Sequence, residues 1–228
     1  MKVFATLIQN LDSTNKTTQK LVAIERFLSE ASNEDKLWLL ALFTGKRPKR
    51  AVNTALLKQW VLEVTELPEW LFIESYAAVG DLGETIALLL PNNEQASNKS
   101  LAQWMNEIVA LKEQTDDQKK SYVLNSWNDL NTIERFIFNK LLGGSFRVGV
   151  SSKTLINALA KHYQIEATAV THAIMGDWKM NEVDFDGLVT GQFTEVNKSQ
   201  PYPFCLAYAL DKNLPDLGKR TDWQIEYK

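Results

Sequence analysis

Residues 17–43 read TTQKLVAIERFLSEASNEDKLWLLALF, and the spacing of their apolar positions decides the expected fold. Leu21, Ile24 and Leu28 recur at intervals of three and four residues, which places them on one face of an α-helix. Asn33 stands immediately before a second apolar run, where an asparagine side chain can cap the start of a helix. The stretch therefore predicts two consecutive helices.

The same helical period continues through almost the whole of the first 190 residues. Pro68 suits the first turn of a helix, and Thr115 with Gln118 fits a capping box ahead of one long helix. Asp81 with Glu84 has the same form. We therefore predict an all-α fold of about ten helices, over 2–11, 17–31, 34–43, 51–65, 68–78, 82–90, 99–113, 117–142, 151–163 and 167–177. The aromatic residues expected in the core of this fold are Trp38, Trp60, Trp70, Trp104, Trp127 and Phe136.

The pattern changes after about Val189. Gly191 and three later prolines break the helical period, and residues 223–227 alternate in the manner of a strand. We predict a helical domain over 1–190, followed by 191–228 as an extended connector and the first strand of a β-containing domain that the chain does not include.

A faint internal echo appears at a separation of about one hundred residues. Apolar runs that begin near Glu34 and Glu134 each lead to a glycine turn, at Gly45 and Gly144, and then to another helix. The identities are so few that chance explains them about as well as duplication does. A duplication would give two similar halves, each offering a basic, glycine-containing turn before a helix.

Composition excludes several classes of protein. The 228 residues are 45% hydrophobic, with one cysteine and two histidines, which leaves no disulfide framework and no Cys-rich metal site. No signal peptide and no apolar stretch of membrane-spanning length is present. We expect a folded, cytoplasmic chain without a metal site.

Charge is segregated along the chain, although the net charge is only −3. Residues 59–98 contain seven acidic residues and no lysine or arginine, whereas residues 135–165 contain five basic residues and no acid. A second basic block, GKRPKR, occupies 45–50. This pattern predicts an anion-binding face opposite an acidic one, and ordinary solvated surface is the alternative.

The stretch LLGGSFRVGVSSKT, residues 141–154, carries the clearest binding signal. Glycines allow close approach of a ligand to the backbone, and a helix that begins at Ser151 presents free N–H groups to an anion. Arg147 and Lys153 add charged donors. An ordinary helix-loop-helix with an exposed arginine is the alternative interpretation.

This stretch resembles a segment in the DNA-binding domain of ATP-dependent DNA ligases, in which a glycine- and arginine-containing turn opens a helix along the minor-groove phosphates of nicked DNA. The match is specific in order and spacing. The resemblance implies phosphate contacts by Gly144, Phe146, Arg147, Gly149, Ser151, Ser152 and Lys153.

Other segments resemble the same family. Residues 11–21 are similar to the start of its second helix, which implies phosphate contacts by Thr14, Lys16 and Lys20, with a capped surface helix as the alternative. The GDLG element at 80–83 also matches, and we expect it to be structural because it fits a helix cap. The basic block at 45–50 has no counterpart that we can align. It is either a solvated loop or a second phosphate clamp formed by Lys46, Arg47 and Arg50.

The end of the chain resembles the entry into a nucleotidyltransferase domain. PYPFCLAYALDK, residues 201–212, is similar to the segment before that domain, and 222–228 is similar to the strand that delivers the nucleophilic lysine. The resemblance makes Lys228 the residue that carries AMP, although the x-D-G that completes the motif does not follow it. ATP and Mg²⁺ would serve the parent enzyme, while this chain alone is expected to hold no cofactor and to be inactive.

The expected function is therefore the DNA-binding portion of a ligase that grips nicked duplex DNA for nick sealing in replication, repair or recombination. We expect a monomer that is cytoplasmic and associated with the nucleoid. The alternative is a helical protein-interaction scaffold that docks a basic partner on residues 59–98, although no repeat of 30–50 residues supports it. RNA ligases and capping enzymes fit less well, because they usually place the nucleophilic lysine near the start of the chain.

Overall fold

The structure is a computed structural model that describes residues 1–93, 97–144, 149–175, 178–180 and 182–191. The described residues form twelve α-helices and one 3₁₀ helix, with no strand among them, which confirms the all-α prediction. The helices are α1 (Lys2–Asp12), α2 (Thr17–Glu30), α3 (Asn33–Thr44), α4 (Thr54–Thr65), α5 (Glu69–Val79), α6 (Leu82–Leu89), α7 (Leu101–Ala110), η1 (Leu111–Glu113), α8 (Asp116–Asp129), α9 (Thr132–Gly143), α10 (Ser152–Tyr163), α11 (Ala167–Met175) and α12 (Phe185–Val189).

The long helix predicted over 117–142 is wrong, because two helices occupy this stretch. Leu130 has an extended backbone, with φ −107° and ψ 139°, and this conformation ends α8. The Asn131 side chain then accepts hydrogen bonds from the backbone N–H groups of Ile133 at 3.1 Å and Glu134 at 3.0 Å. The apolar period runs through the break without interruption, so that an asparagine cap was the only signal for it.

Other boundaries differ by smaller amounts. The helix predicted from residue 51 begins at Thr54, behind an Asn53 cap. The cap of α3 is Ser32, and not Asn33 as predicted. The capping box at Thr115 is confirmed, whereas α12 was not predicted at all.

The internal echo corresponds to a repeated order of helices. Helices α1 to α3 begin at Lys2, Thr17 and Asn33, and α7 to α9 begin 99 residues later at Leu101, Asp116 and Thr132. Helices α4 and α10 are both 12 residues long, and each ends at a residue in the left-handed conformation, Glu66 or Gln164. The described helices thus follow the same order in α1–α6 and in α7–α12, and three of the six pairs, α2 with α8, α3 with α9 and α4 with α10, are equal in length.

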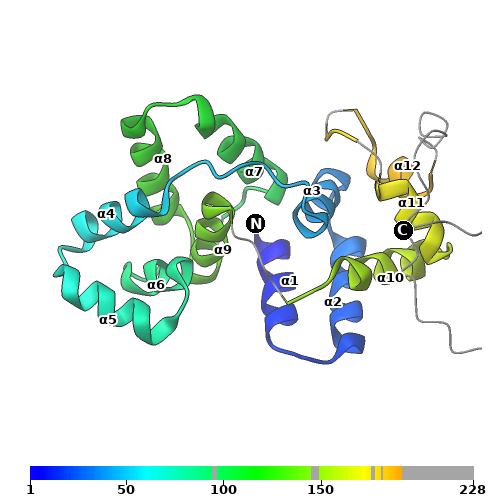
Figure 1. The fold of residues 1–228 in the computed structure, drawn as a ribbon, viewed down its shortest axis with the longest axis horizontal. Helices are drawn as coiled ribbons and strands as arrows, with labels where there is room; N and C mark the ends of the chain where they lie inside the picture. Colours follow the sequence, from blue (N-terminus) through cyan, green and yellow to red (C-terminus); the bar gives the residue numbers. More distant parts are fainter. Residues whose placement is uncertain (94–96, 145–148, 176–177, 181, 192–228) are drawn as a thin grey trace, which may run out of the picture.

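The two halves exchange packing partners (Figure 1). Helices α4–α6 pack with α7–α9 in what we call the middle lobe, and α10–α12 pack with α1–α3 in what we call the N–C lobe. The chain passes from one lobe to the other between α3 and α4, and again between α9 and α10. Contacts of α1 with α9 and of α3 with α7 join the two lobes.

The expected aromatic core is mostly confirmed. Trp38, Trp60, Trp104 and Trp127 are buried, and Phe136 is half-buried against the core. Trp70 was wrongly placed in the core, because 65% of its surface is exposed on α5.

One basic residue of the 135–165 segment is buried. Arg135 is 2% exposed, and its guanidinium donates hydrogen bonds to the carbonyl oxygens of Trp127 at 2.7 Å, Leu130 at 3.2 Å and Pro91 at 3.1 Å. These carbonyls lie at or just beyond the ends of α8 and α6, where helices leave acceptors without partners. Arg135 therefore ties two helix ends together, and the basic surface is narrower than the sequence indicated.

The contact between α6 and α9 explains the GDLG element. A Cβ atom on Gly83 would lie 3.3 Å from the Cβ atom of Asn139, so the two helices approach closely only with a glycine there. The Asn139 side chain donates to the Gly83 carbonyl oxygen at 3.1 Å and accepts from Trp127 Nε1 at 2.8 Å. Asp81 caps α6 by accepting from the N–H of Glu84 at 3.0 Å. This element stabilises the middle lobe.

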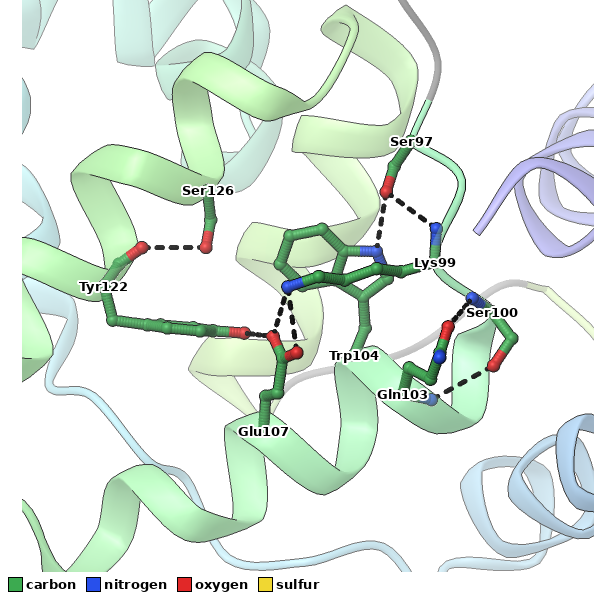
Figure 2. A network of polar contacts seen from close by, with 8 residues as sticks. All are labelled: Ser97, Lys99, Ser100, Gln103, Trp104, Glu107, Tyr122 and Ser126. Atoms are coloured by element: carbon green, nitrogen blue, oxygen red, sulfur yellow. Dashed lines mark hydrogen bonds and ion pairs between the residues drawn. The ribbon is translucent and has the colours of Figure 1, made fainter.

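A polar network joins α7 to α8 (Figure 2). Lys99 Nζ lies 2.8 Å from Glu107 Oε1 and 4.5 Å from the centroid of the Trp104 ring. The Tyr122 hydroxyl donates to Glu107 Oε2 at 2.8 Å. Burial, and then the neighbouring Glu107 carboxylate, raise the pKa of Tyr122 above its ordinary value, so the phenol stays protonated and holds this bond.

Candidate nucleic-acid interface

Three segments that the sequence marked as phosphate-binding lie together at the junction of the lobes. Lys20 Nζ, on α2, donates to the carbonyl oxygen of Gly149 at 2.7 Å. The Ser152 hydroxyl, at the start of α10, donates to the carbonyl oxygen of Phe43 at 3.1 Å. A Cβ atom on Gly144 would lie 3.3 Å from Arg50 Cβ. Residues 94 to 129 positions apart therefore form one surface.

The turn between α1 and α2 leaves the start of α2 open. Thr14 Oγ1 accepts from the N–H of Lys16 at 3.1 Å and is bonded to the Gln19 side chain. Lys16 occupies the cap position without a side-chain hydrogen bond to the helix, and the first turn contains no acid. Lys16 and Thr17 are exposed. No carboxylate in this turn therefore neutralises the positive end of the α2 dipole or its free N–H groups.

The start of α10 is more completely bonded within the protein. Ser151 is the cap, as predicted, and its hydroxyl oxygen accepts from the N–H of Thr154 at 3.2 Å. Ser152 donates to Phe43, so both serine hydroxyls have structural partners. Lys153 is exposed, and no acid lies in the first turn. Lys153 is thus the charged side chain at this helix start that is exposed to solvent.

Two glycines shape the approach to α10. Gly144 ends α9 with φ +65°, and Gly149 has φ +58°, a region in which other residues are strained. Phe146 and Arg147 lie outside the described residues, as does Lys228.

The basic block at 45–50 lies beside this surface and does not form a separate one. Lys46, Arg47 and Arg50 are all exposed, and the backbone of Arg50 passes Gly144. Lys46 Nζ lies 4.9 Å from the centroid of the Trp178 ring, a contact that the sequence gave no means to foresee.

The electrostatic pattern is sharper than the net charge indicates. Residues 13–20 and 149–154 contain three lysines and no acid, whereas the acidic residues of 59–98 that the structure describes lie on or beside α4–α6. Part of that acidic surface is neutralised, since Lys58 Nζ lies 2.8 Å from Glu69 Oε1 and Lys120 pairs with Glu63.

In the described part of the chain, no group of three or more His, Cys, Asp or Glu side chains lies close enough to hold a metal ion. The groove between α3 and α7 is lined by Glu34, Leu37, Trp38, Ala102, Asn106 and Met180, of which Glu34 alone is charged. None of the described helices combines the length and apolar character needed to cross a membrane.

Known proteins match most of this chain. A family model described as DNA ligase N terminus matches residues 1–160, which include every residue of the junction surface. A DNA ligase of Thermococcus fumicolans is 26% identical over 185 residues, and one of Thermococcus onnurineus (strain NA1) is 27% identical over 183 residues. These alignments cover 75% and 74% of this chain and 33% of each relative. A DNA ligase of Methanosphaera stadtmanae is 24% identical over 115 residues, or 47% of this chain and 21% of the relative. The chain thus spans about a third of the length of the first two relatives.

Proposed function

The chain belongs to the DNA ligase N terminus family, and we propose that it is the duplex-binding portion of an ATP-dependent DNA ligase, gripping nicked DNA through minor-groove phosphates. The observation that supports this proposal best is the meeting of α2, α10 and the two connectors between the lobes on one surface, with three lysines and no acid in 13–20 and 149–154. Phosphates, and not bases, would supply most of the affinity, so binding would be salt-dependent and indifferent to sequence.

The residues of this surface would act in two ways. Lys16, Lys153 and Arg147 would contact phosphate oxygens directly, with Lys46, Arg47 and Arg50 extending the basic surface along the duplex. Lys20, by contrast, donates to the Gly149 carbonyl oxygen, and Ser151 and Ser152 hold the start of α10. These three would position the glycine turn and the helix N–H groups, with Thr14 doing the same for the start of α2.

The chemistry would belong to the whole enzyme. Lys228 Nζ would attack the α-phosphorus of ATP, forming a P–N bond as pyrophosphate leaves. AMP would then pass to the 5′-phosphate at the nick, and the 3′-hydroxyl would displace it to form the phosphodiester. Other parts of the enzyme would supply the residues that bind Mg²⁺ and ATP. Residues 1–190 would be the DNA-binding domain and 191–228 the connector, in a monomeric, cytoplasmic and nucleoid-associated enzyme that seals nicks in replication, repair or recombination.

Helix α5 supports a second candidate function, a scaffold for a basic protein partner. Trp70, Ile73 and Tyr76 are 65%, 49% and 44% exposed on its surface, and Glu69 and Glu74 flank them. Apolar side chains exposed together are typical of protein interfaces. We would prefer the scaffold function to the DNA-binding function only if the chain did not bind DNA.

Fluorescence anisotropy with nicked and intact duplexes of two unrelated sequences, at two salt concentrations, tests the proposal. We expect sequence-independent binding that weakens as salt rises. Arg147→Ala and Lys153→Ala should each weaken it by about 1–2 kcal/mol and lower the salt slope by about one phosphate. Arg26→Ala is the matched control, because Arg26 is paired with Glu30 further along α2. An absence of binding at low salt would contradict the proposal and favour the scaffold.

A further inference from the structure

The first turns of α2 and α8 occupy equivalent positions in the two halves but differ in charge. Both helices are 14 residues long, and they begin 99 residues apart, at Thr17 and Asp116. Residues 17–20 read TTQK, and residues 116–119 read DDQK. The glutamine and the lysine are thus retained, while two threonines in one half are replaced by two aspartates in the other.

The start of α8 already holds its own negative charge. Thr115 and Gln118 form a capping box, and Asp116 and Asp117 are exposed in the first turn, where carboxylates interact favourably with the helix dipole. Lys119 Nζ lies 3.9 Å from Asp116 Oδ1. The start of α2, by contrast, has neither a side-chain cap nor an acid. Over a wider window, residues 13–20 contain two lysines and no acid, whereas residues 112–119 contain two lysines and three acids.

The surroundings of the two starts correspond as well. Lys161 on α10 pairs with Glu25 on α2 at 2.8 Å, and Glu63 on α4 pairs with Lys120 on α8. Helices α10 and α4 each follow a connector between the lobes, 144–151 and 45–53 respectively. The two ion pairs therefore link α2 to α10 and α8 to α4. Figure 1 shows the α1–α2 turn and the start of α8 at opposite edges of the molecule.

We infer that Asp116 and Asp117 make the two lobes of this protein hold duplex DNA unequally, by repelling phosphates from the middle lobe, which contains α8. This inference rests on the proposed function. The surface around α2 and α10 is the main grip. The middle lobe presents two exposed carboxylates at the start of α8, so this lobe attracts the duplex weakly. The repulsion acts over about one Debye length, roughly 8–10 Å at moderate salt, and fades as salt rises.

Removal of the two charges tests the inference. Asp116→Asn with Asp117→Asn keeps the size of both side chains and leaves the Thr115 cap intact. The probe is a fluorescently labelled nicked duplex, titrated at low and high salt with the full 228-residue chain. The double variant should bind about 3- to 10-fold more tightly than the wild type at low salt and show a steeper salt dependence.

Two further variants separate local repulsion from a change in net charge. Glu74→Gln with Glu84→Gln removes the same charge from exposed positions on α5 and α6, and should change the affinity less than about 2-fold if the effect is local. Thr17→Asp with Thr18→Asp gives α2 the charges of α8 and should weaken binding at least about 10-fold. Circular dichroism confirms that each variant is folded.

The outcomes distinguish the inference from the proposed function. Binding by the wild type with equal gains in the α8 double variant and in the control would overturn the inference and leave the proposed function intact. No binding by the wild type or by the α8 double variant would overturn both. Tighter binding by the α8 double variant alone would support unequal lobes.

Discussion

Helices α3 and α9 occupy equivalent places in the two halves, and their ends are alike while their surroundings differ. Both are 12 residues long, and each ends at a glycine in the left-handed conformation, Gly45 with φ 82° and Gly144 with φ 65°. A Cβ atom on Gly45 would meet no heavy atom within 4 Å, whereas one on Gly144 would meet Arg50. The turn geometry is thus repeated, and the contact between the connectors occurs at one glycine of the pair.

The interiors of the two lobes differ in a similar way. Leu28 and Leu40 are 1% exposed in the first half, and their counterparts 99 residues later are Trp127 and Asn139, which are hydrogen-bonded to each other. Helix order and the glycine ends of α3 and α9 are therefore common to both halves, whereas buried polar bonds distinguish the second. The comparison teaches that the repeat specifies the helices, and that single polar residues specify how each lobe is held together.

The largest predicted effect distinguishes Arg135 from its counterpart Lys36. Arg135→Met would leave several buried carbonyl oxygens at the ends of α6 and α8 without a donor, so the free energy of unfolding should fall by about 3 kcal/mol. Lys36 is half-buried, with Nζ 3.4 Å from Asn33 Oδ1, and Lys36→Met should cost less than about 1 kcal/mol. Urea unfolding followed by circular dichroism measures both. Equal losses would show that Arg135 does not hold the helix ends.

The next effect concerns the polar pair of the middle lobe. Asn139→Leu introduces the residue that the first half has at this position, but it removes the partners of Trp127 Nε1 and of the Gly83 carbonyl oxygen. We expect a loss of about 2 kcal/mol in the free energy of unfolding. A double-mutant cycle with Trp127→Phe isolates the side-chain pair, and we expect a coupling energy of about 1 kcal/mol. Strict additivity of the two substitutions would contradict the importance of this bond.

A smaller effect distinguishes the two glycines. Gly45→Ala should cost about 1 kcal/mol of unfolding free energy, because an alanine in the left-handed conformation is strained. Gly144→Ala carries the same strain and adds a contact of 3.3 Å with Arg50, so it should cost about 2 kcal/mol. Thermal unfolding of both variants measures this difference in stability. A larger loss for Gly45→Ala than for Gly144→Ala would mean that the contact between Gly144 and Arg50 can be disrupted without loss of stability.

The sequence predicted the helices well where local signals were sufficient. Apolar spacing and caps located most of them, but the period continued through Leu130 and hid the break before α9. The exchange of partners between the halves depends on contacts between distant residues, which no local pattern specifies. The burial of Arg135 had the same origin, because a basic residue in an acid-free segment looks like surface until its neighbours are known.

The sequence predicted which segments form the candidate site, but it predicted the role of each residue less well. Glycines, lysines and a serine cap identified the loop before α10 and the start of α2. The bond from Lys20 to Gly149 and the contact of Lys46 with Trp178 join residues more than 120 positions apart, and nothing in the sequence pairs them. Phosphate contacts by the junction residues stay predictions until binding is measured.

The smallest effect compares two equivalent helix–helix contacts, which we call seams. These are α3 with α12 in the N–C lobe and α9 with α6 in the middle lobe. The Tyr163 hydroxyl and the Asn33 amide donate to the Asp186 carboxylate, and these bonds, the first above all, lower the pKa of Asp186 below its ordinary value. A lowered pKa in the folded state gives stability that is complete above the unfolded pKa, near 3.9, and is lost as the pH falls through the folded pKa.

Because Asp186 is half-buried and partly screened by solvent, this contribution should be less than about 1 kcal/mol. The α9–α6 seam depends on the uncharged Asn139 and should be insensitive to pH. We would measure the unfolding free energy at pH 7 and at pH 3 for the wild type, Tyr163→Phe and Asp186→Asn. Both variants should show a smaller difference between the two pH values than the wild type, while Asn139→Leu should show the wild-type difference. An unchanged difference in Asp186→Asn would mean that this carboxylate is not the group through which acid weakens the N–C lobe.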